Sequence, residues 1–254
     1  MTVSPASEID SLLKVSARIG GEPLLVQAGT GNTSIKLDGV LWIKASGKWL
    51  AHASHDEILV PGSLAETRRR IEQNADPAGQ SAIVGGKALG TSVETAMHSV
   101  LPHRVVLHVH SVNTIAWAVR RDGFAELTAR LEGIDWQWIP YVPSGLPLAR
   151  AVESAIARSP QTSVLVLANH GLVVCAEHCE AAEELLREVE RRVALSAATI
   201  SEAEQVAHPV GQAPVGLFTN AAEPTGTTTV TPLLMMVVEL TGAQDVGLQS
   251  IKGC

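Results

Sequence analysis

Residues 104–110 read RVVLHVH, an almost wholly apolar run that contains two histidines. Valine and leucine dominate it, and residues of this kind favour a buried β-strand. Side chains at positions i and i+2 of a strand point to the same face, so His108 and His110 are expected to lie side by side. Burying a polar group without a partner costs about 1–3 kcal/mol. A bound metal ion would satisfy both imidazoles; the alternative is that each is a core residue with its own hydrogen-bond partner.

A third histidine lies further along, in ANHGLVV at residues 168–174. This run predicts two strand segments with a break at Asn169–Gly171, because glycine lets the backbone turn tightly. His170 lies at the break and would supply a third imidazole from a neighbouring strand. Three protein ligands with one open position are typical of catalytic zinc sites, so the three histidines are candidates for such a site.

A carboxylate is also expected close to these histidines. Residues 92–101, SVETAMHSVL, have helical spacing, with Ser92 placed to cap the helix and Glu94 in its first turn. A short connection leads from this helix into the strand at 104–110, so the helix should fold back against that strand. Glu94 could then ligate a metal ion or transfer a proton. His98 shares the helical face of Glu94, where it could support the site from behind.

The composition indicates a cytoplasmic protein. The chain has 254 residues, 46% of them hydrophobic, which is enough for one large domain. The formal net charge is −7 and no basic stripe with interleaved aromatic residues is present, so we expect no nucleic-acid partner. The most apolar run, residues 233–238, is too short to span a bilayer, and no membrane association is expected. The first ten residues lack the pattern of a signal peptide, and three cysteines make no disulfide framework.

Secondary-structure patterns alternate along the chain. Helical spacing is found at residues 8–19, 63–74, 92–101, 114–121, 146–157 and 179–200. Strand patterns are found within residues 29–47, 104–110, 135–142 and 163–176, whereas residues 76–92 are expected to form a loop. This alternation predicts one α/β domain over residues 1–203. Residues 204–254 form a C-terminal tail with one apolar strand near 233–240, which we expect to pack on the domain or on a neighbouring subunit.

Two glycine-rich loops and one helix start could bind an anion. GTGNTS contains Gly31 and Asn32, and KASGK contains Ser46 and Gly47. Such loops offer backbone N–H groups and short polar side chains, and Ser92 begins a helix whose first N–H groups also favour an anion. GTGNTS matches neither the P-loop pattern nor GxGxxG. The alternative is that these segments are ordinary turns.

Five motifs follow one another along the chain: GNTS, KASG, SVETAMH, LHVHS and ANHGLVV, and a long charged helix comes after them. Together they resemble the class II aldolase/adducin family over about residues 8–203. The segments LWIKASGKWL and SVETAMHSVLPHR look closest to the rhamnulose-phosphate aldolase-like branch. The resemblance implies a three-layer α/β/α sandwich on a mostly antiparallel sheet. It also implies a homotetramer with active sites at the subunit interfaces.

The resemblance also assigns roles to individual residues. His108, His110 and His170 match zinc-binding histidines, and Glu94 matches the carboxylate that ligates the resting metal and serves as acid and base. The positions that match the substrate-phosphate pocket are Gly31, Asn32, Ser46, Gly47 and Ser92. The implied cofactor is Zn²⁺, or another divalent ion such as Mn²⁺ or Co²⁺. The implied reaction is aldol cleavage of a sugar or sugar-acid phosphate through a metal-stabilised enediolate.

Two departures from the family pattern leave other functions open. Many members carry a serine pair before the glutamate, whereas the second position here is Val93. Fuculose-phosphate aldolases use a tyrosine from a neighbouring subunit as a proton donor, but the one tyrosine here, Tyr141, lies in a different part of the pattern. A decarboxylase or epimerase acting on a 3-oxo acid phosphate or a ketose phosphate is therefore an alternative. A non-enzymatic, adducin-like interaction module is another, although such a module has no need for the three histidines and Glu94.

Overall fold

The computed structural model describes residues 4–79, 81–84 and 87–195. The tail expected at 204–254, with its strand near 233–240, lies outside these residues, so its boundary and packing stay predictions. Within the described part of the chain, no helix is long and apolar enough to cross a membrane.

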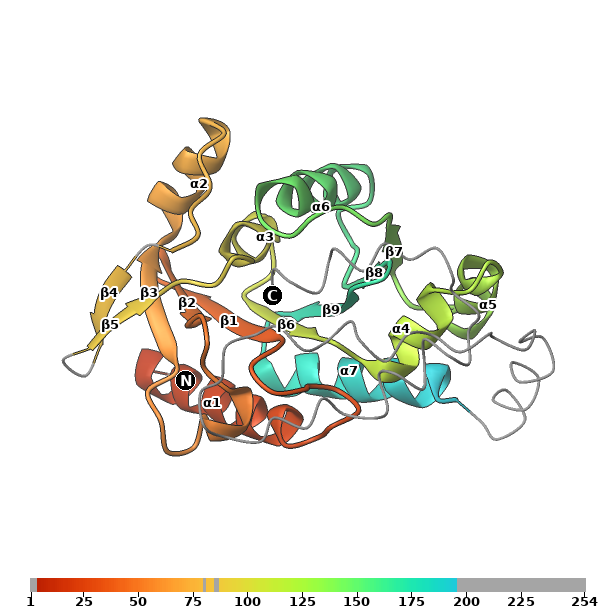
Figure 1. The fold of residues 1–254 in the computed structure, drawn as a ribbon, viewed down its shortest axis with the longest axis horizontal. Coiled ribbons are helices and arrows are strands. Elements are labelled where there is room, and N and C mark those ends of the chain that lie inside the picture. Colours follow the sequence, from red (N-terminus) through yellow and green to blue (C-terminus); the bar gives the residue numbers. More distant parts are fainter. Residues whose placement is uncertain (1–3, 80, 85–86, 196–254) are drawn as a thin grey trace, which may run out of the picture. The chain divides into compact units, whose positions relative to one another are not determined.

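A seven-stranded sheet forms the centre of the described region, with strands in the order β3-β2-β1-β6-β9-β8-β7 (Figure 1). Its strands are β1 (Asn32–Leu37), β2 (Val40–Lys44), β3 (Leu59–Ser63), β6 (Val105–Val109), β7 (Trp136–Ile139), β8 (Val164–Leu167) and β9 (Gly171–Ala176). Neighbouring strands run antiparallel except for β7 and β8, which are parallel. The prediction of a mostly antiparallel sheet is confirmed. β6 lies between β1 and β9, so the strand that carries His108 is in the middle of the sheet.

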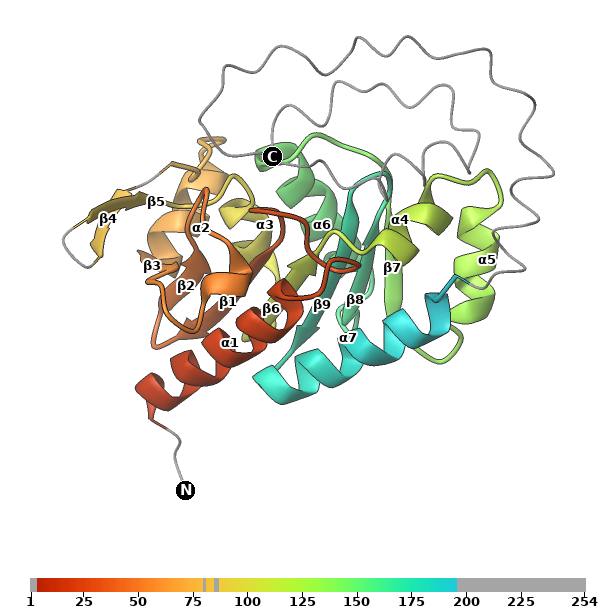
Figure 2. The ribbon, with the colours of Figure 1, turned by 60° about the horizontal axis from the view of Figure 1, so that its bottom comes forward.

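Helices cover both faces of this sheet and complete an α/β/α arrangement (Figure 2). The helices are α1 (Pro5–Gly20), α2 (Leu64–Glu72), α3 (Thr95–Val100), α4 (Val112–Ala118), α5 (Gly123–Arg130), α6 (Leu146–Arg158) and α7 (Cys179–Val193). One face carries α1 and α7, which contact β1, β6 and β9. The other carries α3 and α6, whose Met97, Leu148 and Val152 pack against Val106 and Val173 of the sheet. This burial of apolar side chains on both faces is the main stabilising contribution.

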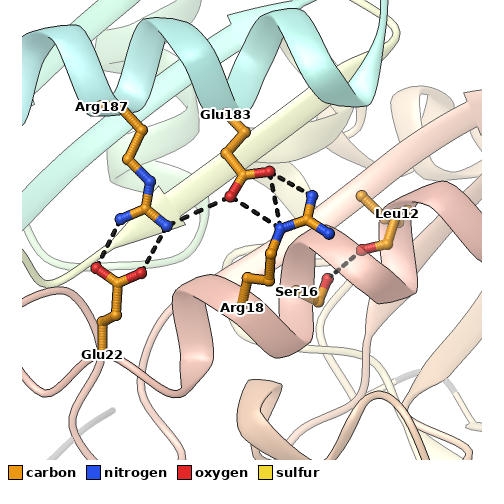
Figure 3. A network of polar contacts seen from close by, with 6 residues as sticks. All are labelled: Leu12, Ser16, Arg18, Glu22, Glu183 and Arg187. Carbon is orange, nitrogen blue, oxygen red and sulfur yellow. Dashed lines mark hydrogen bonds and ion pairs between the residues drawn. The ribbon is translucent and has the colours of Figure 1, made fainter.

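A polar network joins α1 to α7 at the surface (Figure 3). Arg18 of α1 pairs with Glu183 of α7, and Arg187 of α7 pairs with Glu22, which follows α1. The four charges alternate in sign, and Glu183 contacts both arginines. Ion pairs at the surface each contribute about 0–1 kcal/mol, so these pairs add little to the stability of the contact between the two helices.

Several elements differ from the sequence-based expectations. The predicted loop at 76–92 contains a two-stranded hairpin, β4 (Ser81–Val84) and β5 (Lys87–Gly90). Strand β3 was not expected because it contains Pro61 and Gly62, which strands tolerate mainly at an edge, and β3 is an edge strand of the sheet. Helix α5 was also missed. A 3-10 turn, η1, covers Leu50–His52.

The observed helix ends agree only in part with the ends expected from the sequence. The Ser63 hydroxyl accepts a hydrogen bond from the Glu66 N–H and caps α2, as the serine of a capping box does. The expected cap at Ser92 is displaced: its hydroxyl accepts from the Glu94 N–H within a preceding turn, and α3 begins only at Thr95. Helix α7 ends at Val193, before the predicted limit of residue 200, and residues 196–200 lie beyond the described part.

Candidate metal centre

The antiparallel pairing of β6 and β9 places the three candidate histidines at one end of the sheet. His108 pairs with Val173 across the two strands, His110 follows β6, and His170 comes directly before β9. A tight turn delivers His170: Asn169 has a positive φ of 54°, and the His170 N–H donates to the Leu167 carbonyl. A Cβ added to Gly171 would lie 2.5 Å from the Val109 carbonyl oxygen, so only glycine permits this approach.

The three imidazoles face one another. The ring centroids of His108 and His110 lie 5.1 Å apart, those of His108 and His170 4.9 Å, and those of His110 and His170 5.1 Å. One nitrogen from each ring lies within 4.8 Å of the others. His108 is fully buried and the other two are half-buried. We call these residues the histidine triad; the structure brings them together as the sequence predicts.

Glu94 lies against the triad from the helical layer. Its Oε1 atom is 3.3 Å from Nε2 of His108 and 3.0 Å from Nε2 of His170. Its other oxygen, Oε2, accepts a hydrogen bond of 2.5 Å from the Asn32 side-chain amide. Asn32 pairs with His108 in the β1–β6 register, which puts its side chain within reach of the same carboxylate. Glu94 is therefore oriented by a buried amide and points at two triad nitrogens.

Several buried atoms at this centre lack a hydrogen bond of good geometry within the described residues: Nε2 of His108, Nε2 of His170 and Oε1 of Glu94. The Nδ1–H of His108 donates to the Leu172 carbonyl at 3.1 Å, which leaves the Nε2 lone pair directed at the centre. Leaving such atoms unpaired is costly, and imidazole nitrogens with a carboxylate are a donor set that divalent ions such as Zn²⁺ accept. The residues present thus fit a divalent cation.

The charges at the centre are strongly coupled. Burial opposes ionisation of Glu94, but the adjacent His108 and His170 outweigh it and hold the Glu94 pKa well below its usual value. Burial also opposes protonation of His108, but the attraction of Glu94 prevails and raises the His108 pKa. Burial lowers the pKa of His110 to about 3, so that this ring stays neutral. An anionic carboxylate beside neutral imidazoles is the state in which all of them can act as metal ligands.

The segments expected to bind an anion lie at the same end of the sheet as the triad. Gly31 has φ of 68°, and a Cβ there would lie 2.8 Å from the His108 carbonyl oxygen. The Ser46 N–H donates to the Gly90 carbonyl, which brings the KASG loop next to the residues that lead to Ser92. Ser92 is buried two positions before Glu94, whereas Ser46 and the neighbouring Gly47 are exposed. These contacts bring the predicted segments to one end of the sheet.

Two residues in or beside the site have more important contacts than their sequence context suggested. Lys44 is almost fully buried, and its ammonium donates to the carbonyl oxygens of Gly29, at 2.9 Å, and Lys48, at 2.7 Å. Lys44 is the last residue of the apolar strand VLWIK, and a single lysine at such a position is usually exposed. His98, expected only as a supporting residue, is fully buried and contacts Ser34. Tyr141 is 44% exposed in the loop after β7.

Comparisons with known proteins show which proteins this chain is similar to. The chain is 26% identical over 187 residues to the uncharacterized oxidoreductase YuxG of Bacillus subtilis (strain 168); the match covers 68% of this chain but only 27% of that protein. The N-terminal class II aldolase domain of a conserved Thermoplasma acidophilum protein superposes with a TM-score of 0.62 at 22% identity, covering 76% of this chain and 95% of the other. L-fuculose-1-phosphate aldolase from Thermus thermophilus superposes with a TM-score of 0.53 at 17% identity, covering 81% and 99% of the two chains.

The structural similarities establish the fold, and the family follows from the sequence itself. The family model for the class II aldolase and adducin N-terminal domain matches residues 11–196, which is most of the chain. This span contains the triad, Glu94 and every segment around them. The protein therefore belongs to the class II aldolase and adducin N-terminal domain family.

Proposed function

We propose that the protein is a metal-dependent carbon–carbon lyase that performs aldol cleavage of a sugar or sugar-acid phosphate through a metal-stabilised enediolate. The observation that carries the proposal is the position of Glu94, whose Oε1 lies within 3.3 Å of two triad nitrogens. His108, His110, His170 and, in the resting state, Glu94 would hold the ion. We take the ion to be Zn²⁺, with Mn²⁺ or Co²⁺ as alternatives.

The chemistry follows from the residues at the centre. A bound divalent cation would stabilise the negative oxygens of an enediolate, which is the charge that develops when a bond next to a ketone breaks. Glu94 takes the proton from the substrate hydroxyl, and the carbon–carbon bond then breaks. The electron pair of that bond passes into the enediolate. The Asn32 amide holds the carboxylate in position by its hydrogen bond to Oε2. The protein needs no lysine Schiff base for this reaction.

The substrate's anionic group would bind beside Glu94. Gly31 and Asn32, Ser46 and Gly47, and Ser92 come from three segments that meet at this end of the sheet. They provide hydroxyl, amide and backbone N–H donors suited to a phosphate. Val93 replaces one hydroxyl of the family pattern, and its Cγ2 would lie 3.7 Å from a Cβ at Gly145, next to the loop after β7. We therefore expect the phosphate to be bound by fewer side-chain hydroxyls than in the family pattern.

A decarboxylase or epimerase is the second candidate, and Tyr141 favours it. The sequence has no other tyrosine, and this one is 44% exposed on the loop between β7 and α6. Among the described residues this tyrosine makes no hydrogen bond to the triad or to Glu94. Aldol cleavage would need Tyr141 of a neighbouring subunit or another acid to protonate the product. We propose a cytoplasmic homotetramer with active sites at its interfaces, which sedimentation of the purified protein would test.

The test is a screen of ketose 1-phosphates and 3-oxo acid phosphates with added Zn²⁺ or Mn²⁺. Release of dihydroxyacetone phosphate indicates aldol cleavage, and release of carbon dioxide indicates decarboxylation. Glu94→Gln should lower kcat by about 10²–10⁴-fold, because the acid/base group is lost while the shape is kept. Glu190→Gln is the matched control: Glu190 is a half-buried carboxylate that accepts a hydrogen bond from Asn113 on the α4–α7 side. Wild-type turnover in Glu94→Gln would remove Glu94 from the mechanism, and the absence of metal-dependent turnover on every substrate would count against a lyase or decarboxylase.

A further inference from the structure

Two hydrogen-bonded pairs connect β1 to α3. Asn32 and Ser34 are two residues apart on β1, so their side chains lie on the same face of the sheet. Glu94 and His98 are four residues apart along α3 and the turn before it, so they share one side of that segment. Asn32 donates to Glu94, and the Ser34 hydroxyl lies 2.7 Å from Nδ1 of His98. The spacing of two residues on β1 matches the spacing of four residues on the helix side. The two contacts therefore follow one another along the same interface between β1 and α3.

The second pair is fully buried and carries no part of the proposed chemistry itself. Ser34 and His98 are both 0% exposed. Burial lowers the His98 pKa to about 3, so the imidazole is neutral and contributes a hydrogen bond, not a charge. Its Nε2 atom has no hydrogen-bond partner within the described residues. A buried polar atom without a partner costs stability, and the hydrogen bond to Ser34 is the one side-chain hydrogen bond of His98 in the described part of the chain that offsets this cost.

The position of α3 depends strongly on such contacts. The helix is only 6 residues long, and a helix of this length has little stability of its own. Glu94 at its start makes no side-chain capping bond to the helix. The carboxylate is therefore held by what fixes α3 against the sheet: its apolar packing, the Asn32 contact and the Ser34–His98 contact.

We propose that Ser34 and His98 are a positioning pair, which sets the distance of α3 from β1 and so keeps the Glu94 carboxylate against the histidine triad. The inference rests on the proposed function, in which Glu94 serves the metal ion and the reaction. Loss of the pair would let Glu94 move, and a displacement of about 1 Å can reduce turnover by about 10²-fold. Neither residue touches the substrate or the ion in this proposal.

The opposite face of β1 provides a matched control. Thr33 lies between Asn32 and Ser34 and points away from α3; its Oγ1 is 2.7 Å from the hydroxyl of Ser16 on α1. Ser16 gives its own hydrogen to the Leu12 carbonyl, so Thr33 is the donor in this pair. Both contacts are fully buried, and both fix a helix to the same strand. Thr33→Val and Ser34→Ala thus each delete one buried hydroxyl, but only Ser34→Ala affects the helix that carries Glu94.

The experiment compares the wild type, Ser34→Ala and Thr33→Val, with His98→Asn and His98→Leu as a second pair. Zn²⁺ affinity is measured by competition with a chelator, and the visible absorption of the Co²⁺-loaded protein reports the coordination. Turnover and the melting temperature are measured on the same samples. Ser34→Ala should lower Zn²⁺ affinity or kcat by about 10–100-fold, whereas Thr33→Val should lose similar thermal stability without either effect. His98→Asn keeps a polar atom at the position of Nδ1 and should retain most of the function that His98→Leu loses.

The outcomes separate the inference from the proposed function. A wild-type protein that binds Zn²⁺ but turns over no substrate refutes the lyase, and the Zn²⁺ affinity and the Co²⁺ spectrum still test the pair. Equal losses in Ser34→Ala and Thr33→Val would show a general loss of stability and overturn the inference. Unchanged affinity, spectrum and turnover in Ser34→Ala would overturn it as well. A wild-type protein that binds no divalent ion refutes the proposed function and, with it, the inference that depends on it.

Discussion

Replacement of Lys44 by methionine should remove a pH-dependent part of the stability. Lys44 is 2% exposed, and burial lowers its pKa from 10.5 to about 8, although attraction to Glu94 opposes this change. The folded protein therefore releases this proton near pH 8, whereas the unfolded chain holds it up to about pH 10.5. In the range between, the unfolded state binds more protons, so the wild-type free energy of unfolding must rise with pH.

The size of the effect follows from the two pKa values. At about 1.36 kcal/mol per pH unit, lowering the pKa from 10.5 to about 8 corresponds to about 3 kcal/mol of destabilisation by the buried charge. This destabilisation is fully present below pH 8 and disappears as the pH rises toward 10.5. Between about pH 7 and pH 9.5, about 2 kcal/mol of it should be lost. Lys44→Met has no such charge, so its stability relative to the wild type should fall by that amount over the same range.

Urea unfolding at about pH 7 and pH 9.5, in the presence of a chelator, measures this difference. Effects of the substitution that do not depend on the protonation of Lys44 cancel between the two pH values, so the pH dependence isolates its titration. Lys36→Met is the matched variant for comparison, because Lys36 is a second lysine whose pKa burial lowers to about 8. Its ammonium donates to the His103 carbonyl. A stability difference between wild type and Lys44→Met that does not change with pH would refute the reasoning.

The two lysine variants should differ in function. Lys44 holds the carbonyls of Gly29 and Lys48, which belong to the two loops proposed to bind the substrate's anionic group. Lys36 contacts the chain before β6, away from the end of that strand where the triad lies. Lys44→Met should therefore raise KM, and Lys36→Met should not.

Other predictions concern the metal and one glycine. Elemental analysis of unchelated protein should find about one divalent ion per chain, which His170→Ala loses and the exposed His52→Ala keeps. Zn²⁺ affinity should decrease as the pH is lowered, beginning above about pH 6.5, because protonation competes with the ion and Glu94 raises the pKa of His108; equal affinity at about pH 5 and pH 8 would contradict histidine ligation. Gly31→Ala should destabilise the protein by about 1–3 kcal/mol more than Gly39→Ala in urea unfolding, since both have positive φ but only Gly31 has a backbone oxygen 2.8 Å from the added Cβ.

Most of the candidate metal centre could be predicted because its signals are local. The spacing of His108 and His110 places them on one face of any strand, and Gly171 beside His170 marks a turn. Glu94 lies in the segment directly before that strand, so a short connection was enough to bring it near. The same logic failed for β3 and the β4–β5 hairpin, which are short, contain or adjoin glycine and proline, and form no part of the central apolar pattern.

The contacts of Lys44, Ser34 and His98 could not be predicted, because each partner comes from a distant part of the chain. A lysine at the end of an apolar strand is usually exposed; here the loops of Gly29 and Lys48 fold over it. The helical spacing indicated that His98 shares a face with Glu94, but not that this face meets Ser34. Such contacts depend on which strands become neighbours, and that is settled by the packing of the whole sheet.

The register of β1 against β6 decides which partners the residues GNTS contact. A slip of one residue would exchange the two faces of β1, moving Thr33 toward Glu94 and Asn32 toward α1. Gly31 opposes such a slip, because it lies so close to the His108 carbonyl that no residue with a side chain fits there without strain. The glycine fixes the start of the strand, Asn32 then pairs with His108, and Ser34 reaches His98. The strand opposite Glu94 thus contributes to the position of its carboxylate beside the histidine triad, together with the helix that Glu94 precedes.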